Sequence, residues 1–176
     1  EALSLTLGGP AAVTGESRFA TAGGGFSALD AGNAFGGAVT IDTTAGGTAA
    51  PGDATLVAGG DLTLGATKVG ALTLEAGGAL GQSGALTVAG DAALAGASID
   101  LSFSANDFSG VVAAESAGLV SLADAGAIRL GQVDAGALTV AAQDGIDQAA
   151  GTRVSVAGAT ALTTGGGAVT LEAAGN

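Results

Sequence analysis

The chain has 176 residues, of which 34 are glycine, and it contains no cysteine, histidine, methionine, tryptophan or tyrosine. Without histidine or cysteine, Ser-His-Asp and Cys-His nucleophile systems are excluded, as are metal sites built on imidazole or thiolate. Sixteen acidic residues against four basic ones give a net charge of -12, which makes nucleic acid and anionic membrane surfaces unfavourable partners.

The chain is nevertheless rich in small apolar residues. Hydrophobic residues make up 48% of it and charged residues 11%, which separates it from acidic disordered tails. Its 5 phenylalanines are its only aromatic residues, so the large side chains that dominate ordinary cores are scarce. We therefore expect a core of Ala, Val and Leu, with a repetitive backbone supplying much of the stability.

Short segments in which one polar residue separates two apolar ones recur along the chain. This alternation, bounded by Gly, Asp, Asn and Ala, is typical of short strands with one buried face. In chain order the predicted strands contain residues 5–7, 39–41, 62–64, 72–74, 86–88, 120–122, 128–130, 138–140, 154–156 and 169–171. The outer residues of each segment should point into the core and the middle residue to solvent.

No window predicts a helix, because glycine interrupts nearly every stretch with apolar residues at helical spacing. The best candidate, residues 111–125, carries Gly118 at its middle. The longest uncharged stretch, residues 154–171, reaches membrane-spanning length but is broken by Thr160 and the run Gly165–Gly167, so we interpret it as strands and turns. We expect neither a transmembrane helix nor a retained signal peptide.

A longer repeat of about 70 residues is superimposed on the strand pattern. Asn33 to Val39 (NAFGGAV) matches Asn106 to Val112 (NDFSGVV) at an offset of 73 (106 minus 33), and residues 71–74 match residues 137–140 at 66 (137 minus 71). We interpret the difference of seven as a deletion opposite residues 43–53. The predicted copies span residues 1–32 in part, 33–105 and 106–175, with Asn176 beginning a further copy.

Self-similarity at a fixed period predicts a solenoid, in which each unit buries its apolar face on its neighbours. We predict an all-β parallel β-helix (β-solenoid) with about three short strands and about 20 to 24 residues per coil, in about eight coils and about 40 Å long. Leu3, Leu5 and Leu7 at one end, and Val169 and Leu171 at the other, form no polar cap. We therefore expect open sheet edges, which either continue in a longer chain or stack on another one.

Two pairs of carboxylates are candidates for glycoside hydrolysis, Asp144 with Asp147 and Asp100 with Asp107. In the sequence no polar or aromatic residues accompany them to hold a sugar, and Asp is favoured at turns, so we predict turn roles for them. Acidic turns could also hold calcium, but the Gly-Gly-x-Gly-x-Asp pattern of calcium-binding β-rolls is absent. We predict no catalytic residue, cofactor or metal.

Six residues occupy matching places in the two copies, and we predict structural roles for them. Asn is favoured where its amide can satisfy the backbone of a turn, and Phe two residues later would fill a corner of the core. These positions are Asn33, Phe35, Asn106, Phe108, Gln82 and Gln148. Loss of the Asn106 side chain should lower stability without affecting binding.

One family resemblance rests on several of these segments together. The order Asn-x-Phe-x-Gly-x-Val, then residues 120–131 (VSLADAGAIRLG), 137–140 (ALTV) and 145–148 (GIDQ), resembles the repeats of filamentous-haemagglutinin-like bacterial surface exoproteins. It covers about residues 31–176, and the first 30 more weakly. The resemblance implies a right-handed coil, secretion to the bacterial cell surface, and an outer-membrane barrel transporter as partner. The family's amino-terminal secretion domain, with its Asn-Pro-Asn-Gly type motif, does not occur in this sequence.

With this resemblance the sequence predicts a non-enzymatic shaft or stalk of a secreted bacterial adhesin or fibre, of the kind that contributes to biofilms. Its partner would be a host or neighbouring-cell surface. The alternative is an extracellular filament or matrix subunit whose copies stack end to end. A third reading, a β-helical carbohydrate-active domain, is disfavoured because the basic and aromatic residues of such clefts are nearly missing.

Overall fold

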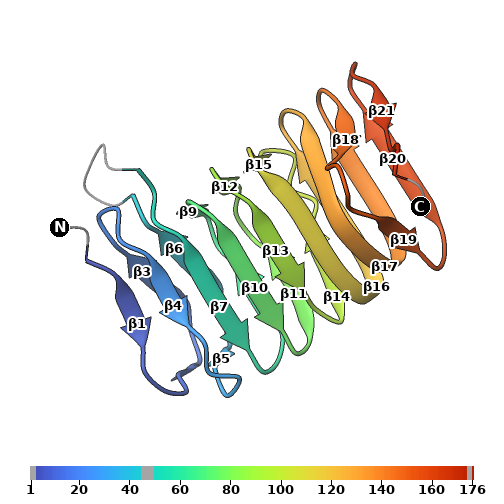
Figure 1. Ribbon diagram of the computed structural model, residues 1–176. Helices are drawn as coiled ribbons and strands as arrows, with labels where there is room; N and C mark the ends of the chain where they lie inside the picture. The colour runs from blue at the N-terminus through green and yellow to red at the C-terminus, as the bar shows by residue number, and fades with distance from the viewer. Residues whose placement is uncertain (1–2, 45–49, 174–175) are drawn as a thin grey trace.

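The computed structural model describes residues 3–44, 50–173 and 176 (Figure 1). Residues 45–49 of the predicted insertion, residues 1–2 of the first predicted copy and residues 174–175 of the last lie outside the described residues.

The described residues form strands joined by turns, without any helix, and so contain none long and apolar enough to cross a membrane. The strands are β1 (Leu5–Leu7), β2 (Ala12–Val13), β3 (Ser17–Ala20), β4 (Phe26–Ala28), β5 (Ala34–Phe35), β6 (Val39–Asp42), β7 (Ala54–Ala58), β8 (Leu62–Leu64), β9 (Thr67–Val69), β10 (Leu72–Ala76), β11 (Ala79–Gln82), β12 (Leu86–Val88), β13 (Ala92–Ala95), β14 (Ser98–Leu101), β15 (Asp107–Phe108), β16 (Val111–Asp124), β17 (Ile128–Ala142), β18 (Ile146–Gln148), β19 (Val154–Val156), β20 (Thr160–Thr164) and β21 (Val169–Thr170). All the predicted strand segments fall on these strands, although β21 ends one residue before Leu171.

The strands stack along one axis as a β-solenoid of about 8 turns, which confirms the predicted fold class (Figure 1). The strands pair in parallel from coil to coil, as in the series β1, β4, β7, β10 and β13. A 19-stranded sheet winds through the coils, and β2 and β5 form a separate two-stranded ladder. The inter-coil hydrogen bonds therefore run along the axis.

Some coils have the predicted length of about 20 to 24 residues, as where Leu138 of β17 pairs with Thr160 of β20, and others are slightly shorter. Paired residues are 18 apart between β7 and β10 (Leu74 and Leu56) and 20 apart between β10 and β13 (Leu72 and Ala92). The pairing of β4 with β7 spans 28 residues (54 minus 26), because the chain segment with the predicted insertion lies between these two strands.

The core forms as the alternation predicted. In β10 the apolar Leu72 and Leu74 are fully buried, whereas Thr73 between them is exposed. The same positions in successive coils stack on one another, which gives a continuous aliphatic core. The N-terminal coils add aromatic packing, since Phe19 stacks on Phe26 at 4.5 Å between ring centroids and meets Phe35 edge-on at 6.2 Å.

Residues 111–125, the best helical candidate in the sequence, instead contain β16, whose 14 residues pass through a corner of the solenoid without interruption. Together with β17, of 15 residues, it departs from the pattern of three short strands per coil. The ladder between them shifts register twice, near Val112 and near Ser116. These shifts allow a continuous strand to turn the corner, because a bulge bends the strand that carries it.

Candidate functional site

Gln82 and Asn106 meet at one corner, one coil apart, and form a reciprocal amide pair. Gln82 Nε2 donates to Asn106 Oδ1 and Asn106 Nδ2 donates to Gln82 Oε1, both at 2.9 Å. Asn106 Oδ1 also accepts the backbone N–H of Leu86, and its Nδ2 also donates to the carbonyl of Leu101. The buried carboxamide thus joins two coils through their backbones.

The second repeat builds the same corner from Gln148 and Asn176. Asn176 Nδ2 donates to Gln148 Oε1 at 2.8 Å, and Gln148 Nε2 donates to Asn176 Oδ1 at 3.0 Å. Asn176 Oδ1 accepts the N–H of Val154, the counterpart of Leu86. The two amide corners, Gln82–Asn106 and Gln148–Asn176, therefore share the reciprocal amide pair and the backbone N–H that the asparagine oxygen accepts.

Asn33 makes similar bonds at a different corner. Its Oδ1 accepts the N–H of Ala11 and its Nδ2 donates to the carbonyl of Val57, so it also bridges neighbouring coils. It follows β4, however, whereas Asn106 follows β14, which lies on the next face of the solenoid. The matched phenylalanines, Phe35 and Phe108, are both buried.

Most aspartates serve the backbone of turns. Asp53, Asp61 and Asp91 each accept, at 2.8 Å, an N–H from the following coil, and thus replace a missing ladder bond. Within the described residues no group of three or more His, Cys, Asp or Glu side chains is placed to hold a metal ion.

The two predicted carboxylate pairs have separate surroundings. Asp147 forms an ion pair with Arg129 at 3.5 Å, and the backbone N–H of Asp144 bonds to Gly126. Asp107 accepts the hydroxyl of Ser109. Asp100, in contrast, lines a small pocket together with Phe103 and Gln82, among other residues. For Asp100, the expectation that no aromatic or polar residue accompanies it was wrong.

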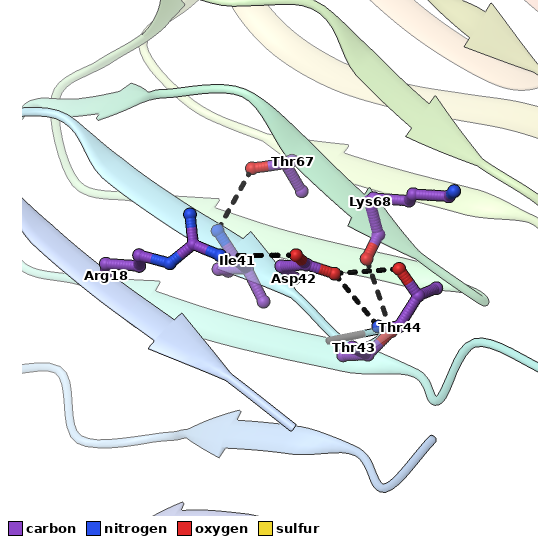
Figure 2. Close-up of polar contacts among 7 residues, drawn as sticks. All are labelled: Arg18, Ile41, Asp42, Thr43, Thr44, Thr67 and Lys68. Carbon is purple, nitrogen blue, oxygen red and sulfur yellow. Dashed lines mark hydrogen bonds and ion pairs between the residues drawn. The ribbon is translucent and has the colours of Figure 1, made fainter. Parts of the chain in front are cut away.

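The buried hydroxyl of Thr67 lies at a bulge in the ladder, where β6 pairs with both β8 and β9 (Figure 2). On either side of the irregularity Val39 pairs with Leu64 and Asp42 pairs with Lys68. The later coil therefore has three residues between the paired positions, where the earlier coil has two. Thr67 Oγ1 accepts the N–H of Ile41 at 3.4 Å and donates to the carbonyl of Gly65 at 3.2 Å. The Thr67 side chain thus satisfies backbone groups that the bulge leaves without a strand partner.

Beside this bulge, Asp42 lies among polar and basic side chains (Figure 2). Its Oδ1 accepts both the hydroxyl, at 2.8 Å, and the N–H of Thr44, and Oδ2 lies 3.4 Å from the guanidinium of Arg18. The hydroxyl of Thr44 is the main cause that lowers the pKa of Asp42, helped by the charges of Arg18 and Lys68. These contacts stabilise a surface turn.

Asp124 is a buried carboxylate that the sequence did not single out. Its Oδ2 accepts the N–H of Phe108 at 2.8 Å and its Oδ1 that of Gly126 at 2.6 Å. Burial raises the pKa of Asp124, with a further contribution from the charges of Asp107 and Asp144. In the sequence it stands in a Leu-Ala-Asp-Ala-Gly segment, which gives no sign that the carboxylate faces inward.

Two segments of the chain, residues 51–115 and 117–176, match a family described as repeats of unknown function (DUF5649). The two segments start 66 residues apart (117 minus 51) and together cover more than half of the chain. No curated protein and no solved structure matches it. On the strength of the two matched segments, the chain belongs to the DUF5649 family of repeats.

Proposed function

We propose that this chain is a non-enzymatic structural shaft of a bacterial cell-surface adhesin or fibre. The observation that carries the proposal is the ladder of parallel strands that continues from coil to coil along the axis. In this arrangement every added coil lengthens the rod by about 4.8 Å. Tension along the rod is shared by the inter-coil hydrogen bonds of several faces, and buried amides such as Asn106 add further links between coils.

The surface location is part of the same proposal. The resemblance of residues 31–176 to filamentous-haemagglutinin-like repeats supports secretion through an outer-membrane barrel transporter and exposure toward a host or a neighbouring cell. Protease treatment of intact producing cells tests it: we expect the parent protein to be degraded while cytoplasmic marker proteins stay intact. Protection of the parent protein until the cells are lysed would contradict a surface location.

The second candidate is an extracellular filament of chains stacked end to end. In such a filament, apolar residues such as Leu3, 82% exposed, and Val169, 45% exposed, would be covered by the coils of another chain. In a longer parent chain, further coils would cover the same surfaces. The two candidates differ in what sets the length of a fibre.

Negative-stain electron microscopy of the native fibres distinguishes the two candidates. A shaft predicts a single length, equal to about 4.8 Å for each coil of the whole parent chain. A stacked filament predicts a broad distribution that extends with protein concentration. Isolated particles with no elongated shape would contradict both.

A further inference from the structure

A small pocket opens on the flank of the solenoid where β8, β11 and β14 stack. Its lining consists of Thr63, Gly81, Gln82, Asp100, Ser102 and Phe103, and its volume is about 230 Å³. Sites for drug-sized ligands typically measure about 300 to 1,000 Å³. The pocket therefore has the size for one small ring.

The pocket exists because Gly81, which lines it, has no side chain. Thr63, Gly81 and Asp100 are paired in register on three successive coils, so they form one outward-facing column. A Cβ atom built on Gly81 would meet nothing within 4 Å. Gly81 thus leaves open space between the Thr63 hydroxyl and the Asp100 carboxylate. Packing does not require a glycine at this position.

Phe103 contributes an exposed aromatic ring at the pocket. It is 48% exposed, whereas the other four phenylalanines, all within the described residues, are buried or half-buried. Its backbone N–H donates to Gln82 Oε1 at 3.3 Å, so the amide corner fixes the loop that carries the ring. A single exposed apolar side chain is common on protein surfaces, so the ring marks a site only together with the pocket that it lines.

The second amide corner supplies an internal comparison. There Ala173 donates its N–H to Gln148 Oε1 at 3.3 Å, just as Phe103 does to Gln82. The column equivalent to Thr63, Gly81 and Asp100 consists of Arg129, Asp147 and Thr170. The Arg129–Asp147 ion pair occupies the space that Gly81 leaves open in the first corner. The same corner is therefore built without an exposed ring, because Ala173 stands where the first corner has Phe103.

We propose that this pocket binds a single hexopyranose unit of a glycan. A pyranose has an apolar face of C–H groups, which suits the Phe103 ring, and a rim of hydroxyls. Asp100 Oδ1 is already engaged by Ser102, but within the described residues nothing bonds to Asp100 Oδ2 or to the Thr63 hydroxyl. The carboxylate oxygen accepts a sugar hydroxyl, and the Thr63 hydroxyl can donate or accept.

Saturation-transfer NMR on the full chain tests the site, with the methyl glycosides of glucose, galactose, mannose and N-acetylglucosamine as probes. We expect transfer to at least one pyranoside, with a Kd on the order of 1 mM, as befits one small ring on an open site. Phe103→Ala should weaken this binding at least about tenfold, since it removes the stacking platform.

A second variant, Gly81→Val, separates loss of binding from loss of folding. Valine suits a strand, and its Cβ would project into open space, so the variant should melt no lower than the wild type while its side chain fills the pocket. Leu119→Ala is the matched control, because it truncates another exposed apolar side chain, 45% exposed, outside the pocket lining.

The proposal is overturned if none of the four pyranosides receives saturation, or if Gly81→Val and Phe103→Ala bind as well as the wild type. It is also overturned if tetramethylammonium, which would use the ring and carboxylate as a cation site, binds in their place. These outcomes do not depend on the shaft proposal, which the fibre lengths test separately.

Discussion

Buried polar side chains in this solenoid bond mainly to the backbone of a neighbouring coil. Asn106 and Asn33 do so with their amides, Ser116 and Thr67 with their hydroxyls, and Asp124 with its carboxylate. The reason is geometric, because corners and bulges leave N–H and C=O groups that no strand can pair, and burying them unpaired is unfavourable. A polar residue in the core here therefore marks an irregularity of the ladder.

Asp124 gives stability a defined dependence on pH. Because burial raises its folded pKa above the ordinary value of 3.8, the folded chain binds the proton more tightly than the unfolded chain. This contribution is complete below the unfolded pKa and is lost as the pH rises through the folded pKa. The free energy of unfolding of the wild type minus that of Asp124→Asn should therefore fall across this range.

Urea denaturation of both proteins, from about pH 3 to about pH 7, measures this difference. The asparagine also loses one acceptor for a buried N–H, which lowers its stability by a constant amount at every pH. A difference that stays flat or rises with pH would contradict the raised pKa.

Asp42 behaves in the opposite sense. Its folded pKa lies below the ordinary 3.8, chiefly because of the Thr44 hydroxyl, so its contribution is present above the unfolded pKa and is lost as the pH falls through the folded value. Thr44→Val should raise the pKa of Asp42, as measured by carboxyl ¹³C NMR titration. Thr40→Val, on the same strand but not bonded to Asp42, should leave that pKa unchanged.

Individual side chains were the least predictable part of the sequence. Asp100 was named among the candidate carboxylates, although a turn role was predicted for it, and Phe103, three residues away, was missed because an apolar residue is expected to be buried. Its exposure depends on the loop geometry that Gln82 imposes from the previous coil. A contact between residues 21 apart in the chain leaves no local signal.

The strands, by contrast, could largely be predicted, because burial on one face forces the period of two that segments such as Leu72–Thr73–Leu74 display. Alanine-rich strands such as β13 (AALA) were missed, since alanine is acceptable both inside and outside. The length of β16 was missed as well: Gly118 was used only as evidence against a helix over residues 111–125, and in the structure it lies within a continuous strand. A Cβ there would lie 2.6 Å from the carbonyl oxygen of Ala97, so this glycine permits close approach at a corner.

The amide corners should make large contributions to the stability of the coils they join. Asn106→Ala leaves the N–H of Leu86 and the carbonyl of Leu101 without partners in a buried corner. Since each such group costs about 1 to 3 kcal/mol, we expect a loss of at least about 2 kcal/mol in the free energy of unfolding. Ser104→Ala, an exposed residue near the same corner, should change it by less than about 0.5 kcal/mol. If the two variants lower the free energy of unfolding equally, the hydrogen bonds of Asn106 do not stabilise the coils.

At the scale of the whole molecule, a shaft and a flank site are compatible because a solenoid separates the two tasks. The inward positions and the corners hold the coils together, and the outward positions of each strand are free to vary, as Gly81 and Asp147 do between two equivalent corners. A binding site of this kind can be added to one coil without altering the others. Function on such a rod is therefore expected in its outward columns.

Because each coil contacts its neighbours along the axis, a whole coil should be removable. Leu72 pairs with Ala54, and Ala54 with Phe26, so deletion of residues 54–71 lets Leu72 take the place of Ala54 with its apolar face still inward. We expect the shortened chain to keep its β-sheet circular dichroism and its cooperative melting, with a rod shorter by about 4.8 Å in small-angle scattering. Deletion of residues 54–62 is the matched control: it would put Thr63 inward and Leu64 outward, because a shift by one residue exchanges the two faces of a strand. If both deletions unfold the chain, its stability belongs to the rod as a whole and not to neighbouring coils; if both fold, the apolar register does not determine which residues face the core.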